Sequence, residues 1–356
     1  DTGDLLPPEL SEIFARLRAD ARPMPGRQLK MVLSEAWGRG WLTQFSRFDV
    51  RPIAAASIGQ VHRARTKDGR DLAIKIQYPG VAQSIDSDVD NVAKLIALSG
   101  VLPDGLALEP LLEEAKRQLH EEADYIGEGA RLELFADAVA DEPDIITPRL
   151  QADLTTKTVL AMTFEAGKPV EKFDAVDQAT RDRIAGLVLD LLFKELFTLR
   201  LMQTDPNFAN FFYDPARETL VLLDFGAAKA IPAKVAEQYR TFLRAGVAGD
   251  HEALARAADD MGFLGPGLPS DVRALLIEMM TMVIEPLRLG EPFDFAASDL
   301  PMKMRDKGLA LQGRRDLAHV PPIELLYIQR KIGGVFLLAS RLRARLDIGA
   351  VARRYL

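Results

Sequence analysis

The sequence has 356 residues, of which 48% are apolar, so it can fill the core of a two-lobed domain or of two ordinary domains. Its net charge of −7 argues against wholesale nucleic-acid binding, which usually needs a basic domain. The absence of cysteine excludes disulfides, thiolate catalysis and Cys-ligated zinc, and the four histidines lack a paired metal-ligand spacing. No stretch of about 18 apolar residues is free of charge, so no membrane-spanning helix is expected.

The N-terminal part of the sequence predicts helices followed by a small antiparallel sheet. A proline-started helix is expected over residues 9–18 and a second helix over 27–37. Strands are expected over 45–53, 59–66 and 71–77, and the Lys67-Asp68-Gly69-Arg70 turn joins the last two as a hairpin.

The rest of the sequence predicts mainly helices. The pattern is helical from residue 89 to 138 with a break at 102–105, and strands are expected over 145–150 and 158–164. An apolar helix over 184–199 then leads directly to a polar loop, a strand over 219–223 ends at Asp224, and everything after Pro232 reads as helical. This order, a sheet lobe and then a helical lobe, indicates an α+β fold.

Three polar positions carry the pattern of a kinase phosphoryl-transfer centre: Asp205, Asn210 five residues later, and Asp224-Phe225-Gly226 after a strand. Upstream, Lys75 in Leu72-Ala73-Ile74-Lys75 offers a charge to nucleotide phosphates. Asn210 and Asp224 offer the oxygen ligands that magnesium prefers, and Asp205 is left to accept a proton from, or to align, an attacking hydroxyl or water. Each motif alone is typical of a strand lysine or a turn, but their order and spacing together favour phosphoryl transfer.

An alanine-rich segment lies where kinases place a glycine-rich flap over the phosphates. The segment reads Ala54-Ala55-Ala56-Ser57-Ile58-Gly59-Gln60-Val61, with Gly59 and Val61 in the register of the glycine-rich pattern. Each methyl group removes backbone freedom and blocks the closest approach to a phosphate, so the segment predicts a stiffened flap.

These motifs together resemble the UbiB-type atypical kinases, which include the mitochondrial coenzyme Q proteins of the ADCK group. The matching segments are Ala54–Gln60, Lys75 with Tyr78-Pro79-Gly80, Glu122-Ala123-Asp124 with Glu128, Gln203-Thr204-Asp205-Pro206-Asn207, and Leu223-Asp224-Phe225-Gly226. The resemblance runs from Leu6-Pro7-Pro8-Glu9-Leu10 to the helix near 328–341. It implies a two-lobed protein-kinase-like fold: an N-terminal helical extension (1–44), a sheet lobe with inserted helices (45–165) and a helical lobe (166–356).

The resemblance also implies roles for single residues. Glu128 is implied to pair with Lys75, and the 53 residues between them to include a helical insertion. The implied catalytic residues are Asp205, Lys75 and Glu128, and the implied magnesium ligands are Asn210 and Asp224. The implied ATP-binding residues are Ala54, Ala55, Ala56, Ser57, Gln60, Lys75, Met162, Asn210 and Asp224, with Glu122 and Asp124 as motif carboxylates. Asp124 and Glu128 are expected to be neighbours on one helix, held together by a cation.

The sequence departs from the family at one motif. The family's Lys-x-Gly-Gln motif lies before the Leu-Pro-Pro-Glu-Leu segment, and this sequence begins too late to contain it. Its lysine meets the E-x-D carboxylates in the family, so Glu122 and Asp124 are expected to lack that partner. The first residue is Asp1 rather than Met, so we expect further residues before it in a longer or unprocessed chain.

The function expected from the motifs and the resemblance is that of an atypical kinase or ATPase. It binds ATP with magnesium and supports ubiquinone or other isoprenoid-lipid metabolism. No Ala-Pro-Glu motif follows Asp224, which favours a small-molecule or lipid acceptor over a protein. Two alternatives stay open: a phosphotransferase of the aminoglycoside or choline kinase type, which the alanine-rich flap and E-x-D motif disfavour, and a nucleotide-binding pseudokinase scaffold.

Charge suggests a further partner. After residue 300 there are twelve Lys and Arg against four Asp and Glu, a local +8 against −15 elsewhere. Basic segments of this kind bind anionic lipid, although a solvated helix face is the commoner explanation. We therefore expect a cytoplasmic protein with peripheral contact to the inner membrane, or, in a eukaryote, a protein on the matrix side of the mitochondrion.

Overall fold

The computed structural model describes residues 24–56, 58–99, 108–204, 207–265, 267–311 and 321–356. The helix expected over 9–18, the helix break at 102–105, Ser57 and Asp205 lie outside the described residues. The chain forms two compact units. The first contains Asp1–Ala166 and Leu222–Gly226, and the second contains Gly167–Val221 and Ala227–Leu356. Asp224 thus belongs to the same unit as Lys75.

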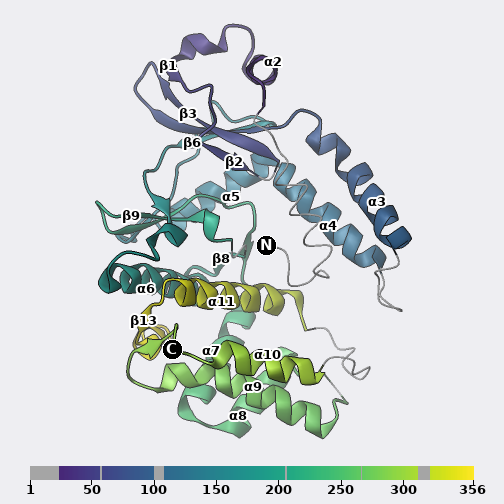
Figure 1. The fold of residues 1–356 in the computed structure, drawn as a ribbon, viewed down its shortest axis with the longest axis vertical. Helices are drawn as coiled ribbons and strands as arrows, with labels where there is room; N and C mark the ends of the chain where they lie inside the picture. The colour runs from purple at the N-terminus through teal and green to yellow at the C-terminus, as the bar shows by residue number, and fades with distance from the viewer. Residues whose placement is uncertain (1–23, 57, 100–107, 205–206, 266, 312–320) are drawn as a thin grey trace. The chain divides into compact units, whose positions relative to one another are not determined.

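The first unit is built on an antiparallel sheet with the strand order β1-β3-β4-β6, and β2 also pairs with β3 (Figure 1). Its elements are α2 (Gly26–Trp37), η1 (Trp41–Gln44), β1 (Phe45–Phe48), β2 (Ala54–Ala56), β3 (Gly59–Thr66), β4 (Asp71–Gln77), α3 (Val81–Ser99), α4 (Leu108–Ala123), α5 (Tyr125–Ala138), β5 (Ile145–Ile146) and β6 (Val159–Thr163). The β3–β4 hairpin has the bounds that the sequence predicts, since Gly69, with φ +96°, supplies the turn between them.

Strand register sorts the side chains between the two faces of this sheet. Val61 lies opposite Lys75, which lies opposite Leu160. The next row is Gln60, Ile76 and Val159. Because directly opposed residues share a face and successive residues alternate, Lys75 and Ile76 point to opposite sides of the sheet.

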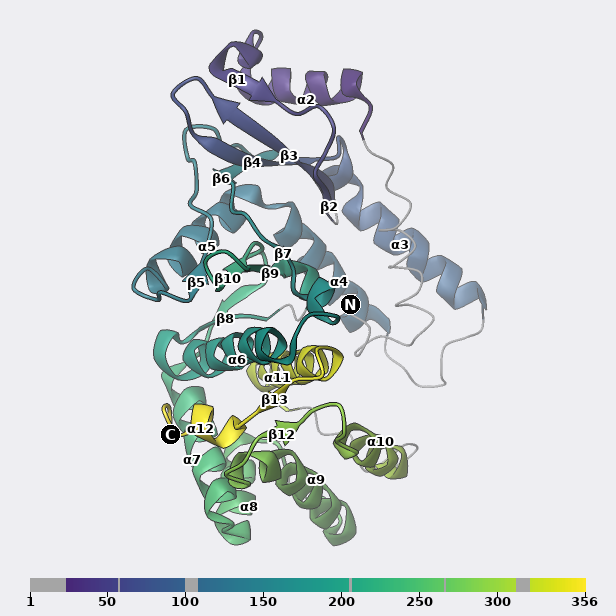
Figure 2. The ribbon, with the colours of Figure 1, turned by 60° about the vertical axis from the view of Figure 1, so that its left-hand side comes forward.

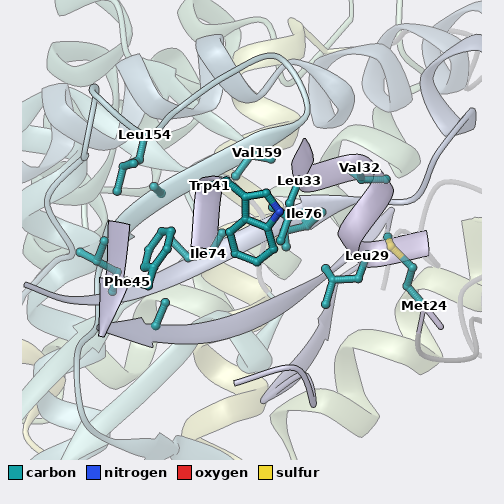
Figure 3. Packing of buried hydrophobic residues seen from close by; sticks show 13 residues of the cluster. Met24, Leu29, Val32, Leu33, Trp41, Phe45, Ile74, Ile76, Leu154 and Val159 are labelled. Atoms are coloured by element: carbon teal, nitrogen blue, oxygen red, sulfur yellow. The ribbon is translucent and has the colours of Figure 1, made fainter. Parts of the chain in front are cut away.

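The Ile76 face of the sheet carries a hydrophobic core that α2 and η1 cover (Figure 3). Leu33 of α2, Trp41 of η1 and Ile74 of β4 belong to this core, and the rings of Trp41 and Phe45 meet edge to face with centroids 6.0 Å apart. Burial of each such side chain contributes roughly 1.5–3 kcal/mol. Residues 24–44, which the sequence suggests as a separate extension, therefore share one core with the sheet.

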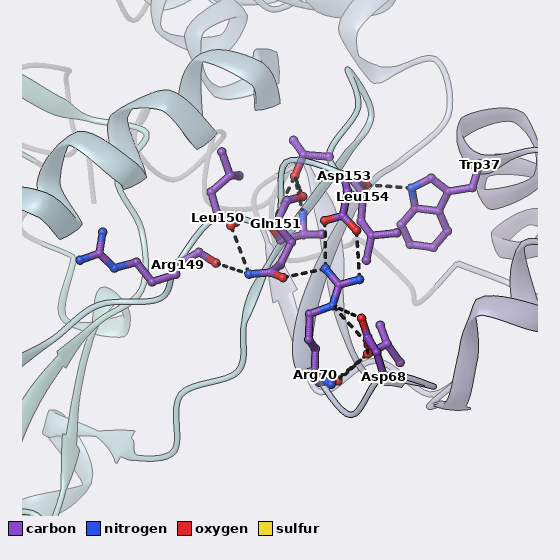
Figure 4. A network of polar contacts seen from close by, with 11 residues as sticks. Trp37, Asp68, Arg70, Arg149, Leu150, Gln151, Asp153 and Leu154 are labelled. Carbon is purple, nitrogen blue, oxygen red and sulfur yellow. Dashed lines mark hydrogen bonds and ion pairs between the residues drawn. The ribbon is translucent and has the colours of Figure 1, made fainter.

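Polar contacts hold the edge of this unit together (Figure 4). Arg70, in the β3–β4 turn, donates to Asp153 at 2.9 and 3.0 Å and to Gln151 at 2.9 Å. The Trp37 indole N–H donates to the Leu154 carbonyl at 2.8 Å. The segment before β6 thus anchors both the hairpin turn and α2.

Helices α3 and α4 form an antiparallel pair, with Lys116 bonded to Asp90 at 2.8 Å and His120 to Asp86 at 2.9 Å (Figure 1). They lie in the sequence between Lys75 and α5, which carries Glu128, so they are the helical insertion that the resemblance implies. None of the described helices has the length and apolar character needed to cross a membrane.

The second unit is mainly helical (Figure 2). Its elements are β7 (Lys168–Pro169), η2 (Val170–Phe173), α6 (Gln178–Lys194), the π-turn η3 (Glu195–Leu199), β8 (Leu201–Gln203), η4 (Phe208–Asn210), β9 (Phe211–Asp214), β10 (Thr219–Leu222), β11 (Ala228–Ala230), α7 (Ala233–Ala248), α8 (His251–Met261), α9 (Ser270–Arg288), β12 (Phe293–Asp294), α10 (Leu300–Leu311), α11 (Ile323–Arg341), β13 (Arg345–Leu346) and α12 (Ile348–Ala352). Helix α11 packs on α6, and α7 packs on α8 and α9.

Four sequence predictions of element bounds are wrong. The strand expected over 45–53 ends at Phe48, because Pro52 cannot donate to the ladder, and the pairing resumes as β2. The helix expected from residue 89 begins at Val81, directly after Gly80 with φ +82°. The strand expected over 145–150 is limited to Ile145–Ile146, since Pro148 follows. The region after Pro232 also contains a strand pair, β12 with β13.

Candidate active site

Lys75 and Glu128 form a buried ion pair on the α5 face of the sheet. The Lys75 ammonium donates to Glu128 Oε1 at 2.7 Å and to Oε2 at 2.9 Å. The two side chains are only 11% and 4% exposed. The pairing that the resemblance implies is therefore present, over a separation of 53 residues in the chain.

A second contact on the same sheet face fixes the beginning of α5. Gln77 follows Lys75 by two positions, so its side chain shares that face, and its amide donates to the Ala123 carbonyl at 2.6 Å. Asp124 then caps α5 by accepting from the Gly127 N–H at 3.0 Å. Glu128 lies one turn into the helix that these contacts start, which explains why its carboxylate reaches Lys75.

Asp224 completes a group of three charges in the first unit. Its Oδ2 lies 3.8 Å from the Lys75 ammonium, and its Oδ1 accepts from the Gly226 N–H at 2.9 Å. Phe225 is buried against Phe135 of α5, with ring centroids 5.0 Å apart. Helix α5 thus holds both Glu128 and the aromatic residue beside Asp224, whose carboxylate stays 39% exposed.

The electrostatics of the group follow from burial and from the three charges. Burial disfavours the charged form of Lys75, but attraction to Glu128 and Asp224 outweighs it and raises the pKa of the ammonium above its ordinary value. Burial raises the pKa of the Glu128 carboxyl to about 7, against the opposing effect of Lys75. Lys75 is therefore a permanent cation at neutral pH.

Tyr125 belongs to this site, although sequence reasoning did not identify it. Its ring lies 5.2 Å from the Lys75 ammonium, and its fully buried hydroxyl has no hydrogen-bond partner among the described residues. Burial raises the pKa of this hydroxyl, so it stays a neutral donor. A tyrosine directly after the E-x-D motif was the available signal.

The alanine-rich flap is the β2–β3 hairpin. Ala54 lies opposite Val61 and Ala56 opposite Gly59, so both methyl groups share the face of Lys75. Only glycine fits at position 59, because a Cβ there would lie 2.2 Å from the Ile76 carbonyl oxygen. The flap therefore packs closely on β4 at Gly59, and the methyl groups of Ala54 and Ala56 lie on the same face of the sheet as Lys75.

This register predicts that the flap methyls limit access to Lys75. Ala54→Val should weaken ATP binding about tenfold or more, because overpacking a close contact costs ~1–3 kcal/mol. Ala55→Val compares the two faces of the strand and should have the smaller effect, since Ala55 is also exposed but shares the Gln60 face. The measurement is calorimetric titration with ATP and magnesium; equal affinities for both variants would refute a role for this face of the flap.

Two residues that the resemblance assigns to ATP binding lie on different faces of the sheet. The buried side chain of Met162 shares the face of Lys75. The Gln60 side chain lies on the opposite face, where it accepts from the Met24 N–H at 2.7 Å and contacts His62 at 2.7 Å. The Gln60 side chain thus has its partners on the α2 side of the sheet, and its assignment to ATP binding stays a prediction.

Asp124 and Glu128 are neighbours across the first turn of α5, as expected, since the Glu128 N–H donates to the Asp124 carbonyl at 2.8 Å, but their carboxylates differ in burial. Asp124 is the exposed N-cap of α5, whereas Glu128 is turned into the interior. Glu122 lies half-buried near the end of α4. The three carboxylates thus occupy three different environments, and only Glu128 contacts Lys75.

The remaining site candidates belong to the second unit. Asn210 ends η4, a short turn that Asn207 starts by accepting from the Ala209 N–H at 3.0 Å. Asp205 and Ser57 lie outside the described residues. The structure thus brings together Lys75, Glu128 and Asp224, and it places Asn210 within a turn.

The donor set fits magnesium and a nucleotide. One carboxylate oxygen of Asp224 accepts from the Gly226 N–H, and the other lies near the Lys75 ammonium. The Asp224 side chain remains accessible to solvent. A hard carboxylate oxygen suits magnesium, and a buried ammonium and an unpaired hydroxyl suit phosphate oxygens. The site can therefore bind an anionic phosphate group together with a divalent cation.

The basic tail is less exposed than its charge suggests. Lys331 is buried, Arg341 pairs with Glu171 at 2.9 Å, and Arg345 pairs with Asp294 at 3.0 Å. Further tail residues with acidic partners are Lys303, Lys307, Arg353 and Arg354. Many of the basic side chains of the tail are therefore already paired with acidic side chains of the second unit.

Comparison with known proteins identifies the family. The model of the ABC1 atypical kinase-like domain matches residues 16–258. The mitochondrial atypical kinase coq-8 of Caenorhabditis elegans is 37% identical over 97% of this chain and 46% of its own length. The mitochondrial atypical kinase COQ8 of Saccharomyces cerevisiae is 36% identical over 96% of this chain and 68% of its own length.

The fold comparison agrees with the sequence comparison. A Mycobacterium tuberculosis protein solved in complex with erythromycin superimposes with a TM-score of 0.79 and 26% identity, over 99% of this chain and 88% of that one. The chain spans between about half and two thirds of the length of the first curated relatives that it matches. The predicted kinase-like α+β fold is confirmed, and the chain belongs to the ABC1, or UbiB, family of atypical kinases.

Proposed function

We propose that the chain binds ATP with magnesium and catalyses transfer of the γ-phosphoryl group to a small-molecule or lipid acceptor, or to water. The observation that carries this proposal is the buried Lys75–Glu128 pair with the Asp224 carboxylate 3.8 Å from the lysine. A permanent cation beside an exposed carboxylate is the arrangement that kinases use for phosphates and their metal.

Each residue has one role in this proposal. Lys75 binds phosphate oxygens, and Glu128 holds the ammonium in place. Asp224 would hold magnesium, a role that the resemblance also gives to Asn210, and the ion would supply positive charge to the phosphate oxygens. Asp205 accepts the proton of the acceptor hydroxyl or aligns it, and the Tyr125 hydroxyl is available to donate to a phosphate oxygen.

Isoprenoid-lipid metabolism, including that of ubiquinone, is the proposed biological setting. Its support is the family and the relatives named as coenzyme Q kinases of mitochondria. Helix α7 begins at Ala233, soon after the Asp224 motif, which favours a small acceptor over a peptide laid along an extended loop.

Release of ADP by the purified chain tests this function. We expect ATP hydrolysis that depends on magnesium and rises when anionic vesicles with an isoprenoid head-group mimic are added. No ADP release under any of these conditions, with nucleotide binding intact, would favour the pseudokinase scaffold instead. Phosphorylation of an aminoglycoside or choline would favour the second enzymatic alternative.

We also predict weak binding of the basic tail to anionic membranes. Each Lys or Arg near an anionic surface contributes ~1 kcal/mol, within a Debye length of about 8 Å. Because Arg341 and Arg345 already have acidic partners, we expect weak, salt-sensitive co-sedimentation with cardiolipin vesicles. Joint Arg341→Glu, Arg343→Glu and Arg345→Glu replacement should reduce it. Equal sedimentation with neutral and anionic vesicles would show that these arginines serve only the second unit.

A further inference from the structure

The second unit contains a fully buried ion pair between Lys331 and Glu195. Lys331 of α11 and Glu195 of η3 are 1% and 0% exposed, and the ammonium lies 3.0 Å from Glu195 Oε2. Taking two charges out of water costs more than their attraction usually returns, so such a pair is weak evidence for stability. Its geometry therefore needs another explanation.

Both charged groups hold the backbone of one residue, Gln203. Lys331 donates to the Gln203 carbonyl at 2.8 Å, and the Gln203 N–H donates to Glu195 Oε1 at 3.1 Å. The Lys331 ammonium also lies 5.0 Å from the ring of Phe211. The last residue of β8 is thus fixed through both its peptide groups by two side chains that come from different helical segments.

Local backbone geometry directs Glu195 to this position. Helix α6 does not end in a regular turn but continues as a π-turn over Glu195–Leu199, followed by Arg200 with φ 51°. A π-turn and a left-handed non-glycine residue are both unfavourable, and they are found mostly at functional positions. Together they return the chain so that Gln203 faces the carboxylate eight residues before it.

The next residue is also held. The Thr204 N–H and hydroxyl both donate to the Ala227 carbonyl, at 3.1 and 2.8 Å. Ala227 directly follows Gly226 of the Asp224 motif. The chain therefore leaves Thr204 with its direction set, one residue before Asp205.

We propose that Lys331 and Glu195 are positioning residues for phosphoryl transfer: they clamp the Gln203 backbone and so set the direction of the chain that enters Asp205. This inference rests on the proposed function for its effect on turnover, but the clamp itself can be measured without nucleotide. Helix α11, which lies far from β8 in the sequence, thereby holds the last described residues before Asp205.

Variants that separate positioning from folding test the clamp. Lys331→Met alone leaves the buried Glu195 carboxylate without its cation and should lower the melting temperature. The double variant Lys331→Met with Glu195→Gln removes both charges but keeps a side-chain oxygen for the Gln203 N–H, so the melting temperature should recover. Lys303→Met is the matched control, because Lys303 pairs with Asp299 on the surface.

Two readouts decide the outcome for the double variant. Hydrogen exchange at the Gln203 and Thr204 amides should become about tenfold faster than in the parent, while exchange in α9 is unchanged. The kcat for ATP hydrolysis should fall ~10–100-fold at constant KM for ATP, since a small misplacement of reacting groups has effects of this size. The Lys303→Met control should match the parent in both readouts.

The contrary results are equally distinct. A double variant with parental melting temperature, parental exchange at Gln203 and Thr204, and parental kcat would overturn the clamp and leave a purely structural pair. If the parent itself does not hydrolyse ATP, the proposed function fails, and the exchange rates still decide whether Lys331 and Glu195 hold this segment.

Discussion

Replacing Asp205 with asparagine is expected to lower the rate of ATP hydrolysis ~10²–10⁴-fold, the usual contribution of a general base. Asparagine keeps the shape of the side chain but cannot accept the proton of an attacking hydroxyl or water. Because this interaction is made mainly in the transition state, the affinity for ATP with magnesium should stay close to that of the parent. The measurement is ADP release under saturating ATP, together with a calorimetric binding titration.

The control for this variant is Asp141→Asn, which changes an exposed aspartate in a surface turn. It should retain both the parental rate and the parental affinity. Hydrolysis by Asp205→Asn at the parental rate would show that Asp205 is only a turn residue. Loss of binding together with turnover would show that it acts on the nucleotide before the chemical step.

Replacing Lys75 with methionine is expected to remove nucleotide binding and to lower the free energy of unfolding by about 3–5 kcal/mol. The reason is that Glu128 then lies buried with neither of its two hydrogen bonds to the ammonium. Chemical denaturation measures the stability, and Arg47→Met is the control, because Arg47 and Asp49 form an exposed pair. That control should change stability by no more than ~1 kcal/mol.

Glu128→Gln provides an independent check on the same pair through pH. Burial raises the pKa of Glu128 from 4.5 to about 7, so the folded chain holds this proton over a range where the unfolded chain has released it. The stability of the parent relative to Glu128→Gln should therefore fall as pH rises from 4.5 to about 7. A difference that is constant over this range, with Lys75→Met as stable as the parent, would contradict a tightly buried pair.

The sequence predicted the parts of the site that short motifs carry. Lys75 follows apolar strand residues, Asp224 follows an apolar strand, and the resemblance supplied Glu128 as the partner of Lys75. These predictions depend on short local patterns, which can be recognised in the sequence without knowledge of the fold. The β3–β4 hairpin was predicted with its observed bounds for the same reason, since a glycine turn between two alternating segments has few other solutions.

The parts that the sequence did not reveal depend on contacts between distant residues. Gln60 was assigned to ATP binding, but strand register places it opposite Ile76, on the face away from Lys75. Lys331 was counted only among the basic residues of the tail, and its partner Glu195 lies 136 residues earlier in the chain. No periodicity distinguishes a buried lysine from an exposed one when the compensating group is this remote. The roles of Tyr125 and Gln77 could not be predicted for a similar reason. They depend on the contact between Gln77 in β4 and Ala123 at the end of α4, 46 residues later in the chain.

A calorimetric titration of the parent and of Asp224→Asn, each with ATP in the presence and absence of magnesium, tests the central claim most directly. The site built from Lys75, Glu128 and Asp224 predicts that the parent binds ATP with magnesium. It also predicts that Asp224→Asn weakens this binding far more than the binding of metal-free ATP, because asparagine is a poorer magnesium ligand while Lys75 remains in place. Equal affinities of the two proteins for ATP with magnesium would contradict the assignment of Asp224, and with it the phosphoryl-transfer site.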